Sequence, residues 1–325
     1  MKLLDPIVAG ASRALLAQAS RGGAHGLSIL IYHRVLAAAD PLFPGEVDIA
    51  AFSRQLEWLK RYYTVLPLLD AVRLVRTGSL PARAACITFD DGYADNETVA
   101  LPVLRAHGLC ATFFVATGFL DGGRMWNDSI IELLRRAPGC VFDARPIGLD
   151  ILDASDLPRR RLAIAYLINQ LKYLPMAERA QQVATLVAAV GYRLDDDLMM
   201  RSEQVLALRK AGMEIGAHTI NHPILAAVDH GCAHHEIAGS KRALEHLLNE
   251  PIPLFAYPNG KPGVDYHADH VDLVRQLGFE GAVSTAHGGR QNDAWQLPRF
   301  LPWARRASLF NLRMLRNLMT RAERA

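Results

Sequence analysis

The sequence predicts an α/β fold in which parallel strands alternate with helices. Three observations support this prediction. Short apolar runs rich in β-branched and aromatic residues recur from residue 27 onward, helical periodicity fills the segments between them, and glycine or proline marks the boundaries. Strands that alternate with helices of this length favour crossover connections and a parallel sheet. At 325 residues, the chain is long enough for one large barrel domain with an insertion or for two ordinary domains.

The first third of the chain shows the alternation most clearly. Residues 27–35 are typical of a buried strand that ends near His33, and residues 48–63 of a helix that Asp48 caps. Further along the chain we expect a short strand over 65–68, a helix over 70–77 closed by Gly78, a strand over 86–89, a helix over 96–107 closed by Gly108, and a strand over 111–116.

The alternation stops at about residue 118. From 118 to 208 the sequence shows no convincing strand, and we expect helices over 128–136, 156–171 and 177–190. This insertion leaves from the carboxyl end of a strand, so it should form a wall or lid over a site there. Its opening residues, Trp126 and Asn127, place an aromatic ring beside a polar group, which suits a sugar. Trp126 in the core, with Asp128 as a helix cap, is the alternative.

The alternation resumes in the last third of the chain. We expect helices over 202–211 (capped by Ser202), 236–248, 269–277 and 311–324, and strands over 213–217, 253–257, 279–284 and 297–300. The last of these helices is basic and amphipathic, so it would either pack on the barrel or rest on an acidic membrane surface.

The strand over 86–89 ends in two adjacent carboxylates and a glycine, Asp90-Asp91-Gly92. Neighbouring side chains on a strand point to opposite faces, so the two carboxylates share a site only if the backbone turns, which Gly92 permits. One carboxylate would then bind a cation and the other would handle a proton. A strand followed by an ordinary Asp-Gly turn is the alternative.

The strand over 213–217 ends in two histidines, His218 and His222. One helical turn would place both imidazoles on the same side, which suits a single metal ion, whereas two histidines in a loop are the alternative. With Asp91 they make a set of two nitrogens and one oxygen that leaves a coordination position open, as catalytic sites do. Zn²⁺ is the first choice for this set, and Fe, Co or Ni would also fit.

Three segments together resemble the polysaccharide deacetylase family, also called carbohydrate esterase family four or the NodB-homology domain. They are Thr88–Gly92, His218–His222 and Phe255–Gly260. The resemblance spans about residues 27–302, and it implies an irregular, TIM-like (β/α) barrel of seven or eight strands with the site at their carboxyl ends. The expected organisation is an N-terminal helix in residues 1–26, the barrel in 27–302 with its helical insertion at about 118–208, and a basic helix in 303–325.

The resemblance also implies roles for individual residues. Asp90 would be the general base, and Asp91, His218 and His222 would hold the metal. The backbone N–H of Tyr257 would help to hold the oxyanion.

Two positions depart from the family pattern. Many members carry an arginine just before the third motif, where this chain has Phe255 and Ala256. We expect Arg299 to reach Asp90 in its place, with a surface arginine as the alternative. The histidine that acts as general acid in many members is matched only approximately, by His287, and His33 is the other candidate.

The function implied is that of a metal-dependent polysaccharide or oligosaccharide deacetylase, which hydrolyses N-acetyl groups of amino sugars in exopolysaccharide or cell-surface glycan metabolism. One alternative is a hydrolase of the same fold that acts on a lipid-linked sugar, an O-acetyl ester or a non-sugar amide. Another is a barrel that binds glycan without catalysis. Residues expected to contact the substrate are His33, Trp126, Asn127, Tyr257 and Pro258.

Composition narrows the partners and the compartment. The net charge of +3 is too small to indicate nucleic-acid binding. Four cysteines without a CxxC pair mildly favour a reducing compartment. We expect residues 7–20 to form an amphipathic helix rather than a secretory signal, because Asp5, Pro6 and Arg13 interrupt the apolar run. The expected location is cytoplasmic or peripheral to a membrane, and an extracytoplasmic one stays open, as does the oligomeric state.

Overall fold

The computed structural model describes residues 26–289, 293–301 and 304–325. The helix expected over 7–20 lies outside these residues. One sheet contains eight short strands: β1 (Ser28–Tyr32), β2 (Thr64–Val65), β3 (Ala84–Phe89), β4 (Thr112–Val115), β7 (Glu214–Ala217), β8 (Leu254–Ala256), β9 (Gly281–Ser284) and β10 (Leu297–Phe300).

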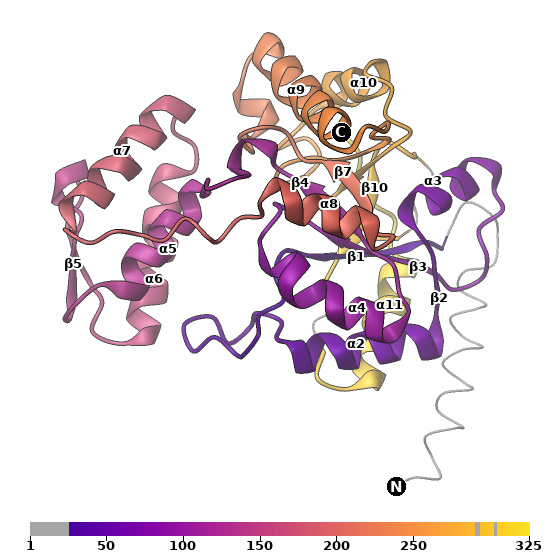
Figure 1. Ribbon diagram of the computed structural model, residues 1–325, viewed down its shortest axis with the longest axis horizontal. Coiled ribbons are helices and arrows are strands. Elements are labelled where there is room, and N and C mark those ends of the chain that lie inside the picture. The colour runs from indigo at the N-terminus through magenta and orange to yellow at the C-terminus, as the bar shows by residue number, and fades with distance from the viewer. Residues whose placement is uncertain (1–25, 290–292, 302–303) are drawn as a thin grey trace, which may run out of the picture.

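The sheet closes into a barrel, which confirms the predicted fold class. Its strand order is β1-β10-β9-β8-β7-β4-β3-β2, and β1 also pairs with β3. That second pairing closes seven strands into a ring and leaves β2 as an extra strand beside β3 (Figure 1). Every pairing in the ring is parallel, so the carboxyl ends of all seven strands meet at one rim.

The described residues contain ten α-helices, which are labelled in Figure 1 and follow or connect these strands: α2 (Ile49–Tyr62), α3 (Leu68–Thr77), α4 (Leu101–His107), α5 (Trp126–Arg136), α6 (Leu157–Leu171), α7 (Met176–Ala189), α8 (Ser202–Lys210), α9 (His230–Leu248), α10 (Ala268–Gln276) and α11 (Ala307–Met319). Local signals placed several ends correctly. The Asp48 side chain accepts a hydrogen bond from the Ala51 N–H (2.7 Å), and Gly78 and Gly108 close α3 and α4 in the left-handed conformation.

The structure differs from the sequence analysis at the beginning of four helices, one of which is α11: it begins at Ala307, not at residue 311, and ends at Met319, not at residue 324. The helix expected over 96–107 begins as a π-helical turn (Asn96–Ala100) before α4. Helix α9 begins at His230, six residues before the predicted start, because Asp229 caps it. Ser202 does not cap α8: its N–H and hydroxyl both donate to Asp121 (2.8 and 2.7 Å), and Arg201 takes the cap position.

The insertion forms a helical lobe beside the barrel, at the left of Figure 1. Helices α5, α6 and α7 enclose an apolar core of their own, built around Leu133, Leu167 and Leu186. The prediction of a strand-free insertion was wrong, because β5 (Val141–Asp143) and β6 (Ile151–Asp153) pair as an antiparallel hairpin. Each has three residues, and the outer two of each are exposed, so neither produces an apolar run that the sequence would reveal.

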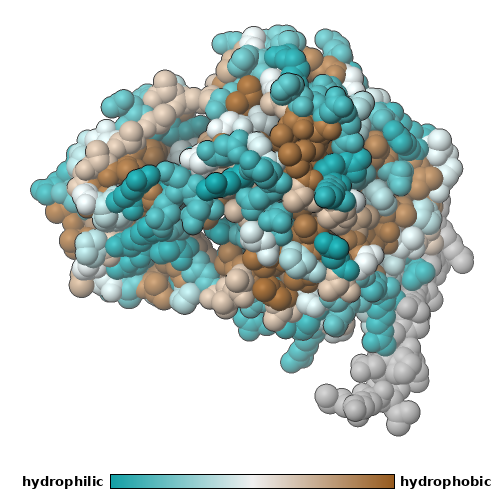
Figure 2. Space-filling view, in the orientation of Figure 1, coloured by the Kyte–Doolittle hydropathy of each residue, from teal (hydrophilic) through white to brown (hydrophobic). Residues whose placement is uncertain are grey.

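The C-terminal helix α11 packs on the barrel. Phe310 lies 5.3 Å from Trp58 between ring centroids, and Met314 and Leu318 are also buried. Polar and apolar side chains intermingle over the face of the molecule that Figure 2 presents. None of the helices in the described ranges combines the length and apolar character that a bilayer crossing demands. Contact of α11 with a membrane surface stays a prediction.

Candidate metal centre and catalytic cavity

A cavity of about 390 Å³ opens at the carboxyl rim of the barrel. Strand register explains which residues meet there. Tyr32 pairs with Phe89, so the next residues, His33 and Asp90, reach the same rim. The neighbouring strands deliver His218 after β7, Asn259 beyond β8 and Thr285 after β9.

Both carboxylates of the Asp90-Asp91 pair are buried at this rim. The backbone turns at Asp91 itself, whose φ of +75° is left-handed, and Gly92 follows with a φ of +89°. The left-handed conformation is unfavourable for most residues other than glycine, and aspartate is among the few that adopt it at low cost. The turn sends the Asp91 side chain toward the two imidazoles, while Asp90 faces Arg299.

The structure brings together Asp91, His218 and His222, the three residues that the sequence analysis named, in a group that could hold a metal ion. One atom of each lies within 4.8 Å of the others. Asp91 Oδ1 is 3.4 Å from Nε2 of both histidines, and although buried it accepts no hydrogen bond within the described residues. His218 Nδ1 lies 2.8 Å from the Ala256 carbonyl, so the ring donates there and leaves Nε2 free. An orphaned carboxylate oxygen between two imidazole nitrogens fits a divalent cation, which would satisfy all three.

The two histidines do not lie on a helical turn as predicted. They flank a loop in which Thr219 and His222 have left-handed φ angles of 64° and 53°. The buried side chain of Glu236, on α9, shapes this loop: Oε2 accepts from the N–H groups of Ile220 (2.9 Å) and Asn221 (2.8 Å). Sequence reasoning missed this role, because it expected Glu236 only as the start of a helix.

Asp90 forms a buried ion pair with Arg299, which the sequence analysis expected. Arg299 Nη1 and Nη2 donate to Asp90 Oδ1 and Oδ2, both at 2.6 Å. Arg299 also donates to Thr88 Oγ1 (3.2 Å) and the Ser284 carbonyl (3.3 Å). Burial raises the pKa of Asp90, but Arg299 and His218 lower this pKa by more than burial raises it. The net shift is downward, and the carboxyl stays ionised.

The pKa values of the other site groups shift in different directions. Burial raises the pKa of Asp91, but His218 and His222 lower it more, so the group is anionic. Burial lowers the pKa of His222 to about 4, which keeps the imidazole neutral as a metal ligand requires. Burial also lowers the pKa of His218, but Asp90 and Asp91 outweigh burial there, and the net shift is upward.

Three of the expected substrate-binding residues line the cavity, namely His33, Trp126 and Asn127. Tyr257 and Pro258 do not. The oxyanion role expected for Tyr257 was wrong, because its N–H donates to the Val283 carbonyl (3.1 Å) within the barrel. Its ring is buried against Tyr266, with centroids 3.9 Å apart.

His287 and Asn259 also differ from expectation. His287 is exposed and lies outside the set of described residues that line the cavity. Asn259, which sequence reasoning missed, lines it with a left-handed φ of +57°, and its N–H donates no hydrogen bond within the described residues. The Asn-Gly pair at 259–260 was the available signal, since asparagine tolerates that conformation.

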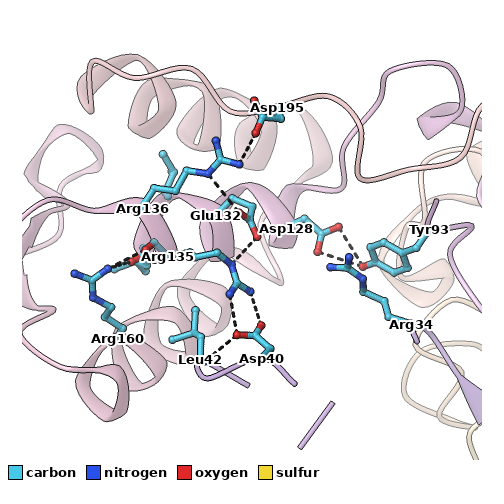
Figure 3. A network of polar contacts seen from close by, with 12 residues as sticks. Arg34, Asp40, Leu42, Tyr93, Asp128, Glu132, Arg135, Arg136, Arg160 and Asp195 are labelled. Atoms are coloured by element: carbon cyan, nitrogen blue, oxygen red, sulfur yellow. Dashed lines mark hydrogen bonds and ion pairs between the residues drawn. The ribbon is translucent and has the colours of Figure 1, made fainter. Parts of the chain in front are cut away.

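The insertion supplies the opposite part of the cavity lining, and Figure 3 shows its polar contacts. Arg135 joins Asp40 (2.8 Å) and Glu132 (2.9 Å). Asp128 is not a helix cap: it lies buried in the first turn of α5, with Tyr93 Oη 3.1 and 3.2 Å from its two oxygens. Burial, reinforced by the charge of Asp91, raises the pKa of Asp128 to about 7.

Known proteins resemble this chain in sequence and structure. A family model described as Polysaccharide deacetylase matches residues 77–139 and 169–282. YxkH of Bacillus subtilis, whose name refers to the same family, is 20% identical over 269 residues, which cover 82% of this chain and 67% of that protein.

Two solved structures share the fold over most of their length. The deacetylase PplD of Streptococcus pyogenes, solved in complex with acetate, superimposes with a TM-score of 0.59 at 20% identity, and IcaB from Ammonifex degensii with 0.58 at 18%. Each alignment covers 90% of this chain and 97% of the other. A de-N-acetylase from Aggregatibacter actinomycetemcomitans follows with a TM-score of 0.54 at 17% identity, covering 85% and 94%.

Proposed function

The chain belongs to the polysaccharide deacetylase family, and from this we propose that it is a metal-dependent enzyme that removes N-acetyl groups from amino sugars of an oligosaccharide or polysaccharide. One observation carries the proposal: an ionised carboxylate, Asp90, lies beside a three-residue ligand set in one cavity. A glycan binder that performs no chemistry has no need of that pairing. The family description, Polysaccharide deacetylase, and the likeness to a protein described as a de-N-acetylase support an N-acetylated polysaccharide or related glycan as the substrate.

Asp91, His218 and His222 would hold one divalent cation, with Zn²⁺ as the first choice for two imidazoles and one carboxylate. Such a cation would act as a Lewis acid: it would lower the pKa of water enough to make it a nucleophile near neutral pH, and it would polarise the acyl oxygen. The chain's own residues orient it. The Ala256 carbonyl fixes the His218 ring, and Glu236 fixes the loop that carries His222.

Asp90 is the general base in this proposal. A carboxylate has about four lone-pair positions, and Arg299 occupies one on each oxygen, so others remain for a water proton. The ion pair keeps Asp90 ionised and prevents it from rotating. Asn259 offers its free backbone N–H as the oxyanion donor in place of Tyr257.

The departing amine needs a proton, and two side chains in the cavity can supply it. One is His33 and the other is Asp128. The pKa of Asp128, about 7, leaves the Asp128 carboxyl partly protonated at neutral pH. His287 lies outside the cavity lining and is not part of the proposed mechanism.

An acetate-release assay tests the proposal. N-acetylglucosamine oligomers should release acetate with the metal-loaded protein, and release should stop after chelation and return with Zn²⁺. O-acetylated sugars and an N-acetylated non-sugar amide form the comparison panel, and they distinguish the alternative hydrolases. A protein that binds no divalent cation and releases acetate from none of these compounds would contradict the proposal.

A further inference from the structure

The wall that the insertion contributes to the cavity carries a buried positive charge. Arg179, in the first turn of α7, is only 6% exposed, and it lines the cavity together with Lys172, which follows α6. Charged side chains are almost never this buried unless a partner of opposite charge or a ligand balances them.

No acidic side chain in the described part of the protein balances Arg179. Its one hydrogen bond there runs from Nη1 to the Lys172 carbonyl (3.1 Å), and its guanidinium lies 4.8 Å from the centre of the Trp126 ring. Burial lowers the pKa of Arg179, and no carboxylate is near enough to raise it again. The Lys172 ammonium lies 5.6 Å from the centre of the Tyr173 ring and forms no ion pair with any described residue.

The other two cationic side chains of the cavity are neutralised by the protein. Arg34 forms an ion pair with Asp95 at 2.6 Å. Arg135 forms ion pairs with Asp40 and Glu132, which Figure 3 shows. The cations that line the cavity therefore fall into two classes, and only those at the α6–α7 end have no counter-charge among the described residues.

A purely structural arginine in the same lobe has a different pattern of contacts. The guanidinium of Arg160, on α6, donates hydrogen bonds of 2.9 to 3.0 Å to four backbone carbonyls, those of Ala154, Leu134, Arg135 and Ala137. Arg179 donates to one carbonyl and leaves its other N–H groups without an acceptor among the described residues. The helix-end carbonyl and the Trp126 face compensate its charge only in part.

We propose that Arg179 and Lys172 form an anion-binding subsite, and that the N-acetylated glycan bound in this cavity carries a carboxylate or phosphate group. The inference rests on the proposed deacetylase function and adds the charge of its substrate. A guanidinium offers two parallel N–H groups to the oxygens of either anion, and an ammonium adds a second charge. The subsite shares the cavity with Asp91, His218 and His222, so one substrate molecule can occupy both.

Binding measurements by titration calorimetry test the subsite without requiring turnover. Three probes are compared: N-acetylglucosamine, N-acetylglucosamine 1-phosphate, and a disaccharide of glucuronic acid and N-acetylglucosamine. The wild-type protein should bind one of the anionic probes at least about tenfold more tightly than the neutral sugar. The preferred anionic probe identifies the source of the anion as a sugar phosphate or an acidic sugar.

Variants then assign the preference to these side chains. Arg179→Met should abolish the preference for the anionic probe, and Arg179→Lys should keep part of it. Arg160→Met, the matched control, should lower thermal stability and leave the ratio of affinities unchanged. If Arg179→Met does not fold, Lys172→Met decides by the same ratio, because the lysine is only half-buried.

Two results would overturn the subsite. One is equal affinity of the wild-type protein for all three probes, and the other is a loss in Arg179→Met or Lys172→Met that is the same for neutral and anionic sugars. The test also separates this inference from the proposed function. Acetate release from neutral oligomers without anion preference rejects the subsite alone, whereas anion preference without any acetate release rejects the deacetylase alone.

Discussion

Arg299 and Asp90 lie 209 positions apart in the chain and meet through two parallel hydrogen bonds of 2.6 Å, both residues almost fully buried. Removing one residue of such a buried ion pair is strongly destabilising, because the charge that remains is compensated neither by a partner nor by solvent. The relationship links the last strand of the barrel to the proposed general base at the end of β3, and it underlies the first prediction.

Replacing Arg299 by alanine should move the acid limb of the pH–rate profile to higher pH. Burial raises the pKa of Asp90, and Arg299 is the main group that reverses this, so its removal lets the pKa rise. The variant should also lose about 3–5 kcal/mol of unfolding free energy in denaturant titrations. Arg299→Lys keeps the charge and should show a smaller shift. An acid limb at the wild-type position would argue against the contact in solution.

Asp90→Asn should retain the metal and lose turnover by a factor of at least about 10²–10⁴, since the amide cannot accept the water proton. Metal content by elemental analysis and acetate release on the same preparation check both halves. A near-normal rate would remove Asp90 from the role of base.

His222→Ala and Asp91→Asn should lose metal before they lose structure. Each removes one of only three protein ligands, and Asp91 Oδ1 already lacks a hydrogen-bond partner. Metal stoichiometry after dialysis is the measurement. His235→Ala, on the exposed side of α9, is the control and should keep full occupancy. Full occupancy in all three variants would show that the ion binds elsewhere.

Glu236→Gln should weaken metal affinity by roughly 10–100-fold, the usual effect of losing a group that orients a ligand. One carboxylate oxygen accepts from the N–H groups of Ile220 and Asn221 and the other from the side-chain amide of Asn221, so glutamine replaces one of these two acceptors with a donor. Competition with a chelator of known affinity measures the change. Glu245→Gln on the same helix, beside Lys241, should leave it unaltered. Identical affinities for the two variants would deny Glu236 this positioning role.

Asp128→Asn should become more stable relative to wild type as pH rises from about 4 to 7. The folded protein holds the Asp128 proton up to a pKa of about 7, whereas the unfolded chain releases it near 4. The folded state therefore binds more protons in this window, and wild-type stability declines with pH by up to about 4 kcal/mol relative to the amide. Denaturant titrations of chelated protein at pH 4.5 and 7.5 measure the slope. Parallel pH dependences would show that Asp128 is solvated.

Features that depend on neighbouring residues were readable from the sequence. Apolar runs separated by helical periods predicted the barrel strands, and Asp48, Gly78 and Gly108 marked helix ends through their own backbone chemistry. The left-handed turn after Asp90 was also within reach, because an aspartate followed by glycine permits it. The hairpin of β5 and β6 was not, since strands of three residues with exposed ends carry no apolar pattern.

The sequence alone determined the alternating strands and helices, the ligand types and the motif pair that indicate a hydrolytic metal site. Only the tertiary structure decided which side chains share the cavity. It placed Asn259 there rather than Tyr257, joined Arg299 to Asp90, and left Arg179 without a counter-charge among the described residues. The physical reason is that periodicity and turn chemistry act over a few residues, whereas barrel closure and register bring together groups that no local pattern relates.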